Sequence, residues 1–119
     1  MRYMLLIYGT DSAWEEAGRK ECYHESTELA HELVANGQFI ATAPLQDLAT
    51  ATSVQVRDGK RVVTDGPFAE TREYLGGYFL VDVANLGEAI AIAERIPGAR
   101  VGTVEIRPVH ELQGLPTAS

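Results

Sequence analysis

The stretch from Val63 to Glu73 combines turn-forming and charged side chains more densely than any other part of the sequence. It reads Val-Thr-Asp-Gly-Pro-Phe-Ala-Glu-Thr-Arg-Glu. Asp65 can accept hydrogen bonds from backbone N–H groups, Gly66 allows a positive φ and Pro67 fixes the exit, so the first half predicts a tight turn. A turn does not require the charged side chains that follow, at Glu70, Arg72 and Glu73.

Two interpretations of these charges are open. In the first, the stretch forms a polar pocket at the edge of a sheet, where Asp65 supplies a carboxylate and Arg72 binds an anionic group through two parallel hydrogen bonds. The ligand-binding residues are then Gly66, Pro67, Phe68, Glu70, Arg72 and Glu73. In the second, a turn is followed by a solvated ion pair, which contributes ~0–1 kcal/mol. Spacing alone favours the second interpretation.

His24 is the candidate for acid–base chemistry, because histidine titrates near neutrality and a neighbouring carboxylate fixes its tautomer. Asp47 and Asp65 are its candidate partners, and His24 with Asp65 forms the predicted catalytic pair. A histidine on the polar face of a helix explains His24 equally well without any catalytic role.

The histidines do not predict a metal site. His24 and His31 are seven residues apart, which on a helix is about 10 Å of rise, too far to share one ion. Glu28 and His31 form a Glu-x-x-His pair, but carboxylate-bridged metal sites need a second such pair on another helix. The sequence also lacks dinucleotide-binding, phosphate-loop and nucleophile-elbow motifs. We therefore predict neither a metal nor a cofactor.

Composition excludes several classes of function. The 119 residues carry a net charge of -7, and the ten basic residues are scattered along the chain. Nucleic-acid binding needs clustered Lys and Arg, and anionic membranes repel an acidic surface, so neither partner is expected. No apolar run approaches the ~20 residues of a membrane helix. The single Cys22, without a signal peptide, indicates a reducing, cytoplasmic setting, and we expect it to be a small buried residue.

The elements that position these residues follow from hydrophobic period and turn signals. Strands are predicted at residues 2–8, 38–43, 51–56, 61–64, 77–83 and 102–109. A helix lies between Ser12 and Asn36, and a second begins at the capping residue Asn85 and ends at Pro97-Gly98. Asp58-Gly59 predicts a hairpin. We expect one α+β domain over residues 1–110, ferredoxin-like β-α-β-β-α-β with an inserted β-hairpin, and a flexible tail over 111–119.

The strand pattern also predicts an assembly. Residues 1–8 and 77–83 are apolar on both faces, yet two helices can cover only one face of the sheet. The other face would remain an exposed apolar patch, which is typical of an interaction surface. We therefore expect a homodimer with sheets packed face to face. The aromatic side chains of Trp14, Tyr23, Tyr74 and Tyr78 could line a pocket, although isolated aromatics more often belong to the core.

Nearly the whole chain resembles the DGPF-type branch of the YCII-related proteins. The resemblance lies in residues 3–8, the hairpin at 51–59, the stretch at 63–73, Gly76-Gly77-Tyr78-Phe79 and residues 104–108. It implies a bacterial protein of the dimeric α+β barrel superfamily, with His24 as the nearest counterpart of a first-helix histidine found in some members. Arg72 stands where the family commonly has Lys. With the resemblance taken into account, the polar-pocket interpretation of the charged stretch is supported almost as well as the interpretation as a turn with a solvated ion pair.

Three hypotheses for function remain. The first is small-molecule binding or acid–base catalysis in a dimer pocket near the Asp-Gly-Pro-Phe loop, and we favour it. The second is a regulatory adaptor whose acidic surface contacts a sigma factor, because relatives are often encoded beside sigma factors of the extracytoplasmic-function type. The third is a purely structural dimer. Whether the chain is an enzyme stays open.

Overall fold

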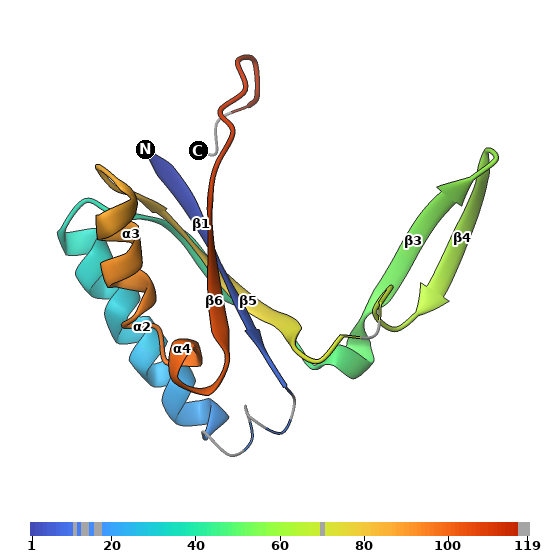
Figure 1. Ribbon diagram of the computed structural model, residues 1–119, viewed down its shortest axis with the longest axis horizontal. Coiled ribbons are helices and arrows are strands. Elements are labelled where there is room, and N and C mark those ends of the chain that lie inside the picture. Colours follow the sequence, from blue (N-terminus) through green and yellow to red (C-terminus); the bar gives the residue numbers. More distant parts are fainter. Residues whose placement is uncertain (11, 13–14, 16–17, 70, 117–119) are drawn as a thin grey trace.

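A four-stranded antiparallel sheet forms the centre of the structure (Figure 1). This computed structural model describes residues 1–10, 12, 15, 18–69 and 71–116. The sheet has the order β2-β5-β1-β6 and consists of β1 (Arg2–Gly9), β2 (Phe39–Pro44), β5 (Tyr74–Asp82) and β6 (Thr103–Pro108). The helical elements are α2 (Arg19–Ala35), the 3-10 helix η1 (Leu48–Thr50), α3 (Leu86–Ala93) and α4 (Gly98–Val101). With the hairpin set aside, this is the predicted ferredoxin-like β-α-β-β-α-β plan.

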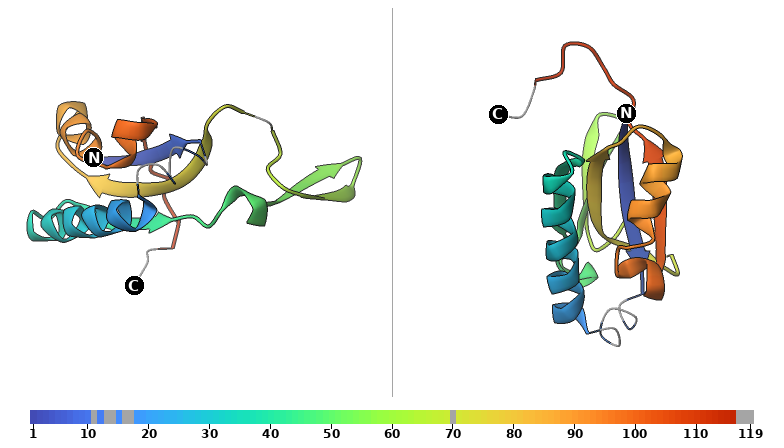
Figure 2. Two further views of the ribbon diagram at one scale, coloured as in Figure 1. Left: turned by 90° about the horizontal axis from the view of Figure 1, so that it is seen from below. Right: turned by 90° about the vertical axis from the view of Figure 1, so that its left-hand side faces the viewer.

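One face of the sheet is buried under the helices, as the right-hand view of Figure 2 shows. Alternate residues of β1 and β5 point to this face because side chains change sides at every step along a strand. The core consists of Tyr3, Leu5, Ile7, Phe79, Val81 and Val83 from this face, packed against Leu29, Leu33, Ala89, Ile92, Ala93 and Ile96. The helices therefore cover one face of two strands that the sequence predicted to be apolar on both faces.

Local sequence signals place several boundaries correctly. The Asn85 side chain accepts a hydrogen bond from the Glu88 backbone N–H at 3.0 Å, and the Glu88 carboxylate accepts one from the Ala84 N–H at 2.7 Å. These reciprocal bonds are the capping box predicted at the start of α3. Asp58 and Gly59 both have positive φ, at 52° and 74°, which a tight hairpin turn requires.

Two boundaries differ from the prediction by three residues or more, whereas the other strand ends agree to within one residue. α3 ends at Ala93 rather than continuing to Pro97, and Pro97 instead stands at the start of the short α4. A proline is tolerated there because the first turn of a helix does not use its backbone N–H. β5 begins at Tyr74, three residues before the predicted start, because the residues before Gly77 also pair with β1.

The predicted hairpin lies outside the main sheet. β3 (Thr52–Arg57) and β4 (Lys60–Asp65) form a two-stranded sheet of their own, here called the arm, which projects from the body (Figure 1). The Cα radius of gyration is 16.0 Å, whereas a compact domain of this length has about 13.5 Å. The arm and the chain that extends beyond β6 both contribute to this extended shape.

Beyond β6 the described chain forms no further helix or strand up to residue 116. None of the described helices is both long and apolar enough to cross a bilayer.

Candidate functional site

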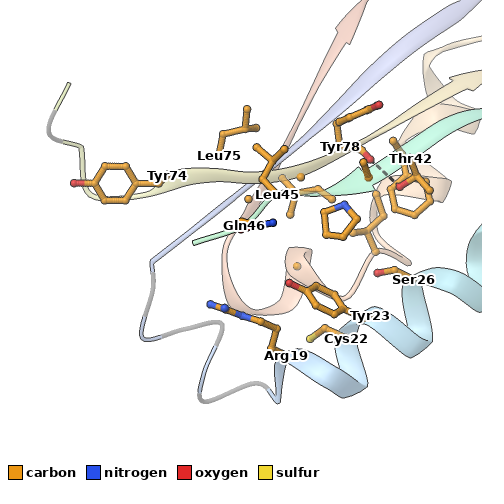
Figure 3. A pocket seen from close by; sticks show the side chains of 18 of the residues that line it. Arg19, Cys22, Tyr23, Ser26, Thr42, Leu45, Gln46, Tyr74, Leu75 and Tyr78 are labelled. Carbon is orange, nitrogen blue, oxygen red and sulfur yellow. Dashed lines mark hydrogen bonds between the residues drawn. The ribbon is translucent and has the colours of Figure 1, made fainter. Parts of the chain in front are cut away.

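A cavity of about 150 Å³ lies between α2 and the ends of β2 and β5 (Figure 3). Its apolar floor comes from the buried face of the sheet and from the chain after α3, through Ile7, Phe79 and Ile96. The loop between β2 and η1 and the first residues of β5 close the other sides. The cavity therefore joins segments that are far apart in the sequence.

Close approach of two strands shapes one wall of this cavity. Gly77 of β5 pairs with Pro44 of β2, and a Cβ at Gly77 would lie 3.0 Å from the carbonyl oxygen of Ala43. We predicted that Gly76-Gly77 would admit either a ligand or another backbone. At Gly77 the structure places the backbone of β2.

Polar side chains line the cavity from three directions. Tyr23 and Ser26 project from α2, Thr42 comes from β2, and Gln46 comes from the loop that follows (Figure 3). The Thr42 hydroxyl donates to the backbone oxygen of Tyr78 at 2.8 Å, which ties β2 to β5 at this wall. Hydroxyl and amide groups above an apolar floor are the usual composition of a small-molecule site.

Arg19 and Asp47 form an ion pair in the cavity lining. The guanidinium Nη1 donates to the Asp47 carboxylate, and this hydrogen bond raises the pKa of Arg19 above its ordinary value. The Arg19 side chain is 35% exposed and that of Asp47 is 60% exposed, so the pair lies at the solvent side of the cavity. It connects the start of α2 to the loop after β2.

Cys22 is buried beside the cavity, as predicted for a small apolar residue. Burial raises the pKa of its thiol, and this effect is larger than that of the positive charge of Arg100, which lowers the pKa by favouring the thiolate. A thiol with a raised pKa carries little thiolate near neutrality and is a weak nucleophile. We therefore assign Cys22 to the wall of the cavity and not to chemistry within it.

The predicted ligand-binding stretch lies beside the cavity and not in its lining. Asp65 ends β4 and is exposed, and Arg72 is exposed in the connection to β5. Among the described residues, neither side chain makes a hydrogen bond or ion pair. Glu73 is half-buried, and Glu70 lies outside the described residues.

The middle of that stretch connects to the arm. The Gly66 N–H donates to the carbonyl of Ala51 at 2.7 Å, and the Ser53 hydroxyl donates to the carbonyl of Gly66 at 2.7 Å. Gly66 has a φ of 106°, so the positive φ predicted there is confirmed. Pro67 and Phe68 follow and are exposed, Phe68 at 83%.

His24 lies on the solvent side of α2, away from the cavity. Its Nε2 is 3.0 Å from the Glu28 carboxylate one helical turn away, and both side chains are exposed. The structure therefore pairs His24 with Glu28, and Asp47 with Arg19. In the part of the chain that the structure describes, no three His, Cys, Asp or Glu side chains cluster as metal ligands would.

Sequence reasoning missed most of the cavity. Of the four aromatics named as pocket candidates, Tyr23, Tyr74 and Tyr78 are among the residues that line it, and Trp14 lies outside the described residues. The Tyr78 ring points to the face of the sheet away from α2, because its neighbour Phe79 points to the buried face, so Tyr78 borders the cavity through its backbone. Figure 3 shows the Tyr74 ring pointing away from the cavity, so this residue contributes at the edge. Nothing in the sequence pointed to Arg19 and Ser26 as cavity residues, because polar residues on a predicted helix are normally assigned to its solvent-exposed face.

The sheet order and the helices on one face define an α+β protein of ferredoxin-like architecture. The family model of the YCII-related domain matches residues 1–113, and the chain belongs to this family. It is similar to an uncharacterized protein of Rhizobium meliloti (strain 1021), with 32% identity over 114 residues that cover 92% of each chain.

Proposed function

We propose that the protein binds a compact organic acid in the cavity beside α2. The observation that carries the proposal is the combination, in one cavity, of an apolar floor, hydroxyl-bearing walls and the guanidinium of Arg19. The apolar body of such a ligand rests on Ile7, Phe79 and Ile96, and its carboxylate lies against Arg19.

The volume limits the size of the ligand. An apolar cavity of ~150 Å³ accommodates a molecule such as benzene. The cavity here has about the same volume. A single ring or an equivalent branched chain with one head group therefore fits, whereas a nucleotide does not.

The arginine favours a carboxylate head group. Asp47 accepts a hydrogen bond from Nη1, and a guanidinium carries five N–H donors in a planar fork. The Nε and Nη2 edge is then available to a carboxylate, which arginine binds through two parallel hydrogen bonds. Asp47 holds the guanidinium in place and competes with the ligand for the same charge.

The proposal is for binding and not for acid–base catalysis. His24, the predicted base, is exposed on α2 and is outside the lining of the cavity. What supports a site near the charged stretch is that Tyr74, Leu75, Gly76 and Gly77, which follow that stretch directly, line the cavity.

The test compares benzoate with benzyl alcohol and benzylamine, which share the ring and differ in head-group charge. Isothermal titration calorimetry should show tightest binding for benzoate. A hydrogen bond to a charged group contributes ~1.5–3 kcal/mol. Because Arg19 is partly exposed, we expect its contribution to the free energy of benzoate binding to lie at the lower end of this range. Arg19→Gln should then weaken benzoate binding about tenfold.

Asp47→Asn is the matched variant, and it should change the affinity for benzoate in the opposite direction from Arg19→Gln. It removes the competing carboxylate, so benzoate should bind at least as tightly as to the wild type. Ser26→Phe fills the cavity and should abolish binding, whereas Ser26→Ala should preserve it. Equal affinity for the three probes, or benzoate binding unaffected by both Arg19→Gln and Ser26→Phe, would refute the proposal.

A further inference from the structure

Helix α2 borders the cavity along about two of its turns. The residues that it contributes have the spacing i, i+3, i+4, i+7 and i+8, which is one face of a helix, and they are Arg19, Cys22, Tyr23, Ser26 and Thr27. Arg19 and Ser26 stand at the two ends of this row, about 10 Å apart along the helix axis. In Figure 3 they lie on opposite sides of the cavity. The cavity therefore has a charged end and a hydroxyl-bearing end.

The two ends also differ in their exposure to solvent. At the charged end the pair of Arg19 and Asp47 is partly exposed, and Tyr23 is 43% exposed. At the other end Ser26 is half-buried, and Leu29, less than one turn further along α2, is buried in the core. A ligand whose carboxylate lies against Arg19 therefore points its far end inward, toward Ser26.

The Ser26 hydroxyl is available to a ligand, whereas two other hydroxyls in the lining already donate to the protein. Thr27 donates to the backbone oxygen of Tyr23 at 2.8 Å. Thr42 donates to the backbone oxygen of Tyr78 at 2.8 Å. Ser26 makes no hydrogen bond to any other residue that the structure describes. Figure 3 shows its oxygen pointing from α2 toward the cavity, where it can both donate to and accept from a ligand.

A hydroxyl is the ligand group that suits this end of the cavity. Burying a charge over the apolar floor would cost far more free energy than burying a neutral group that is hydrogen-bonded. A hydroxyl is neutral, and it donates and accepts as the serine hydroxyl does. A single ring with a carboxylate and a hydroxyl at opposite positions, hydrogen-bonded at both ends, has a length of the order of the ~10 Å that separate Arg19 and Ser26 along the helix.

We infer that the organic acid carries a hydroxyl at the end opposite its carboxylate, and that Ser26 recognises this hydroxyl. The ligand class is then a hydroxyaryl acid, for which 4-hydroxybenzoate serves as the probe. Arg19 binds the acid group, and Ser26 distinguishes between acids of similar size. The inference rests on the proposed function, because the carboxylate on Arg19 is what directs the hydroxyl toward Ser26.

The test is isothermal titration calorimetry with benzoate, 4-hydroxybenzoate and 2-hydroxybenzoate, which differ only in the presence and position of the hydroxyl. One added hydrogen bond between neutral groups should make the wild type bind 4-hydroxybenzoate about 3- to 10-fold more tightly than benzoate. In 2-hydroxybenzoate the hydroxyl lies beside the carboxylate and therefore away from Ser26. The affinity for this isomer should not depend on the Ser26 hydroxyl.

Two variants each remove one hydroxyl from the same face of α2. Ser26→Ala should bring the affinity for 4-hydroxybenzoate down to about that for benzoate, because the hydrogen bond that separates the two acids is lost. Thr27→Val, the matched control, should keep the wild-type ratio of the two affinities, because the Thr27 hydroxyl already donates within the helix. The ratio is measured within each variant, so any general effect of a substitution on folding or on carboxylate binding cancels.

The outcomes separate this inference from the proposed function. Benzoate binding that depends on Arg19, without a preference for 4-hydroxybenzoate, would support the proposed function and overturn the role of Ser26. A preference that persists in Ser26→Ala would overturn it as well. So would a preference that is lost in Tyr23→Phe instead, because the ligand hydroxyl would then lie at the exposed end, or an affinity for 2-hydroxybenzoate that falls equally in Ser26→Ala. Binding of none of the three acids would overturn both proposals.

Discussion

Replacing Gly102 by alanine should destabilise the fold far more than replacing Gly77, although each glycine lies against a neighbouring strand. A Cβ built at Gly102 would lie 2.0 Å from the carbonyl oxygen of Tyr8 and 3.1 Å from the Cα of Gly9. At Gly77 the nearest atom, the carbonyl oxygen of Ala43, would be 3.0 Å away. These two distances set the order of the effects.

The magnitudes follow from opposing contributions. Alanine gains about 0.5–1 kcal/mol over glycine in a strand, because glycine loses more conformational freedom on folding. Overpacking costs ~1–3 kcal/mol when a few tenths of an ångström of movement relieve it. Gly77→Ala should therefore lower the free energy of unfolding by ~0–2 kcal/mol. At Gly102 the backbone of β1 would have to move by about 1 Å, so the cost should exceed ~3 kcal/mol.

Urea denaturation of both variants and the wild type measures these differences. The dependence of the unfolding free energy on urea concentration should be the same in all variants, so that a shift in the midpoint of the unfolding transition reports a change in stability alone. Each kcal/mol should lower Tm by about 3–6 °C for a domain of this size. Val34→Ala, at an exposed position of α2, is the control and should change stability by less than ~0.5 kcal/mol. A Gly102→Ala variant as stable as Gly77→Ala would refute the reasoning.

Two further predictions concern titrating groups. Arg100 donates hydrogen bonds of 2.9 and 3.0 Å to Glu25, and these bonds hold the pKa of the Glu25 carboxyl below its ordinary value. The small stabilisation of the fold by this pair is therefore present above about pH 4.3, the pKa of an unfolded Glu. It is lost as the pH falls through the pKa of Glu25 in the folded protein. Arg100→Gln should raise the Glu25 pKa in a carboxyl NMR titration, and an unchanged value would disprove this cause. Because burial raises the pKa of Cys22, iodoacetamide at neutral pH should alkylate it much more slowly in the folded protein than in denaturant. Equal rates would show that the thiol is accessible.

The sequence predicted the fold because its signals are local. Alternation along β1 and β5 depends on neighbouring residues, and the Asn85 cap and the Asp58-Gly59 turn each act over four residues or fewer. Pro97 was misplaced because a proline signals the start of one helix as readily as the end of another.

The cavity could not be predicted in this way, because its polar groups meet only after folding. Arg19 and Asp47 are 28 residues apart, and Ser26 and Thr42 come from different elements. On the helix, Arg19 and Ser26 read as solvent-facing, and no period or spacing shows that the loop after β2 returns to them. His24 attracted attention by its residue type and by its likeness to a first-helix histidine of some relatives, yet it is exposed on α2 beside Glu28 and outside the cavity lining.

The charged stretch joins the arm to the candidate binding cavity. Gly66 closes the base of the arm through Ala51 and Ser53, and the chain then enters β5, where Tyr74 to Gly77 line the cavity. A substitution at Asp65 or Arg72 can therefore act on assembly, on binding, or on both, and one readout alone cannot separate a site from a structural turn. Measuring the dissociation constant of the predicted homodimer and the affinity for benzoate on the same variant separates them. A change confined to assembly assigns the stretch to the arm, whereas a change confined to affinity assigns it to the site.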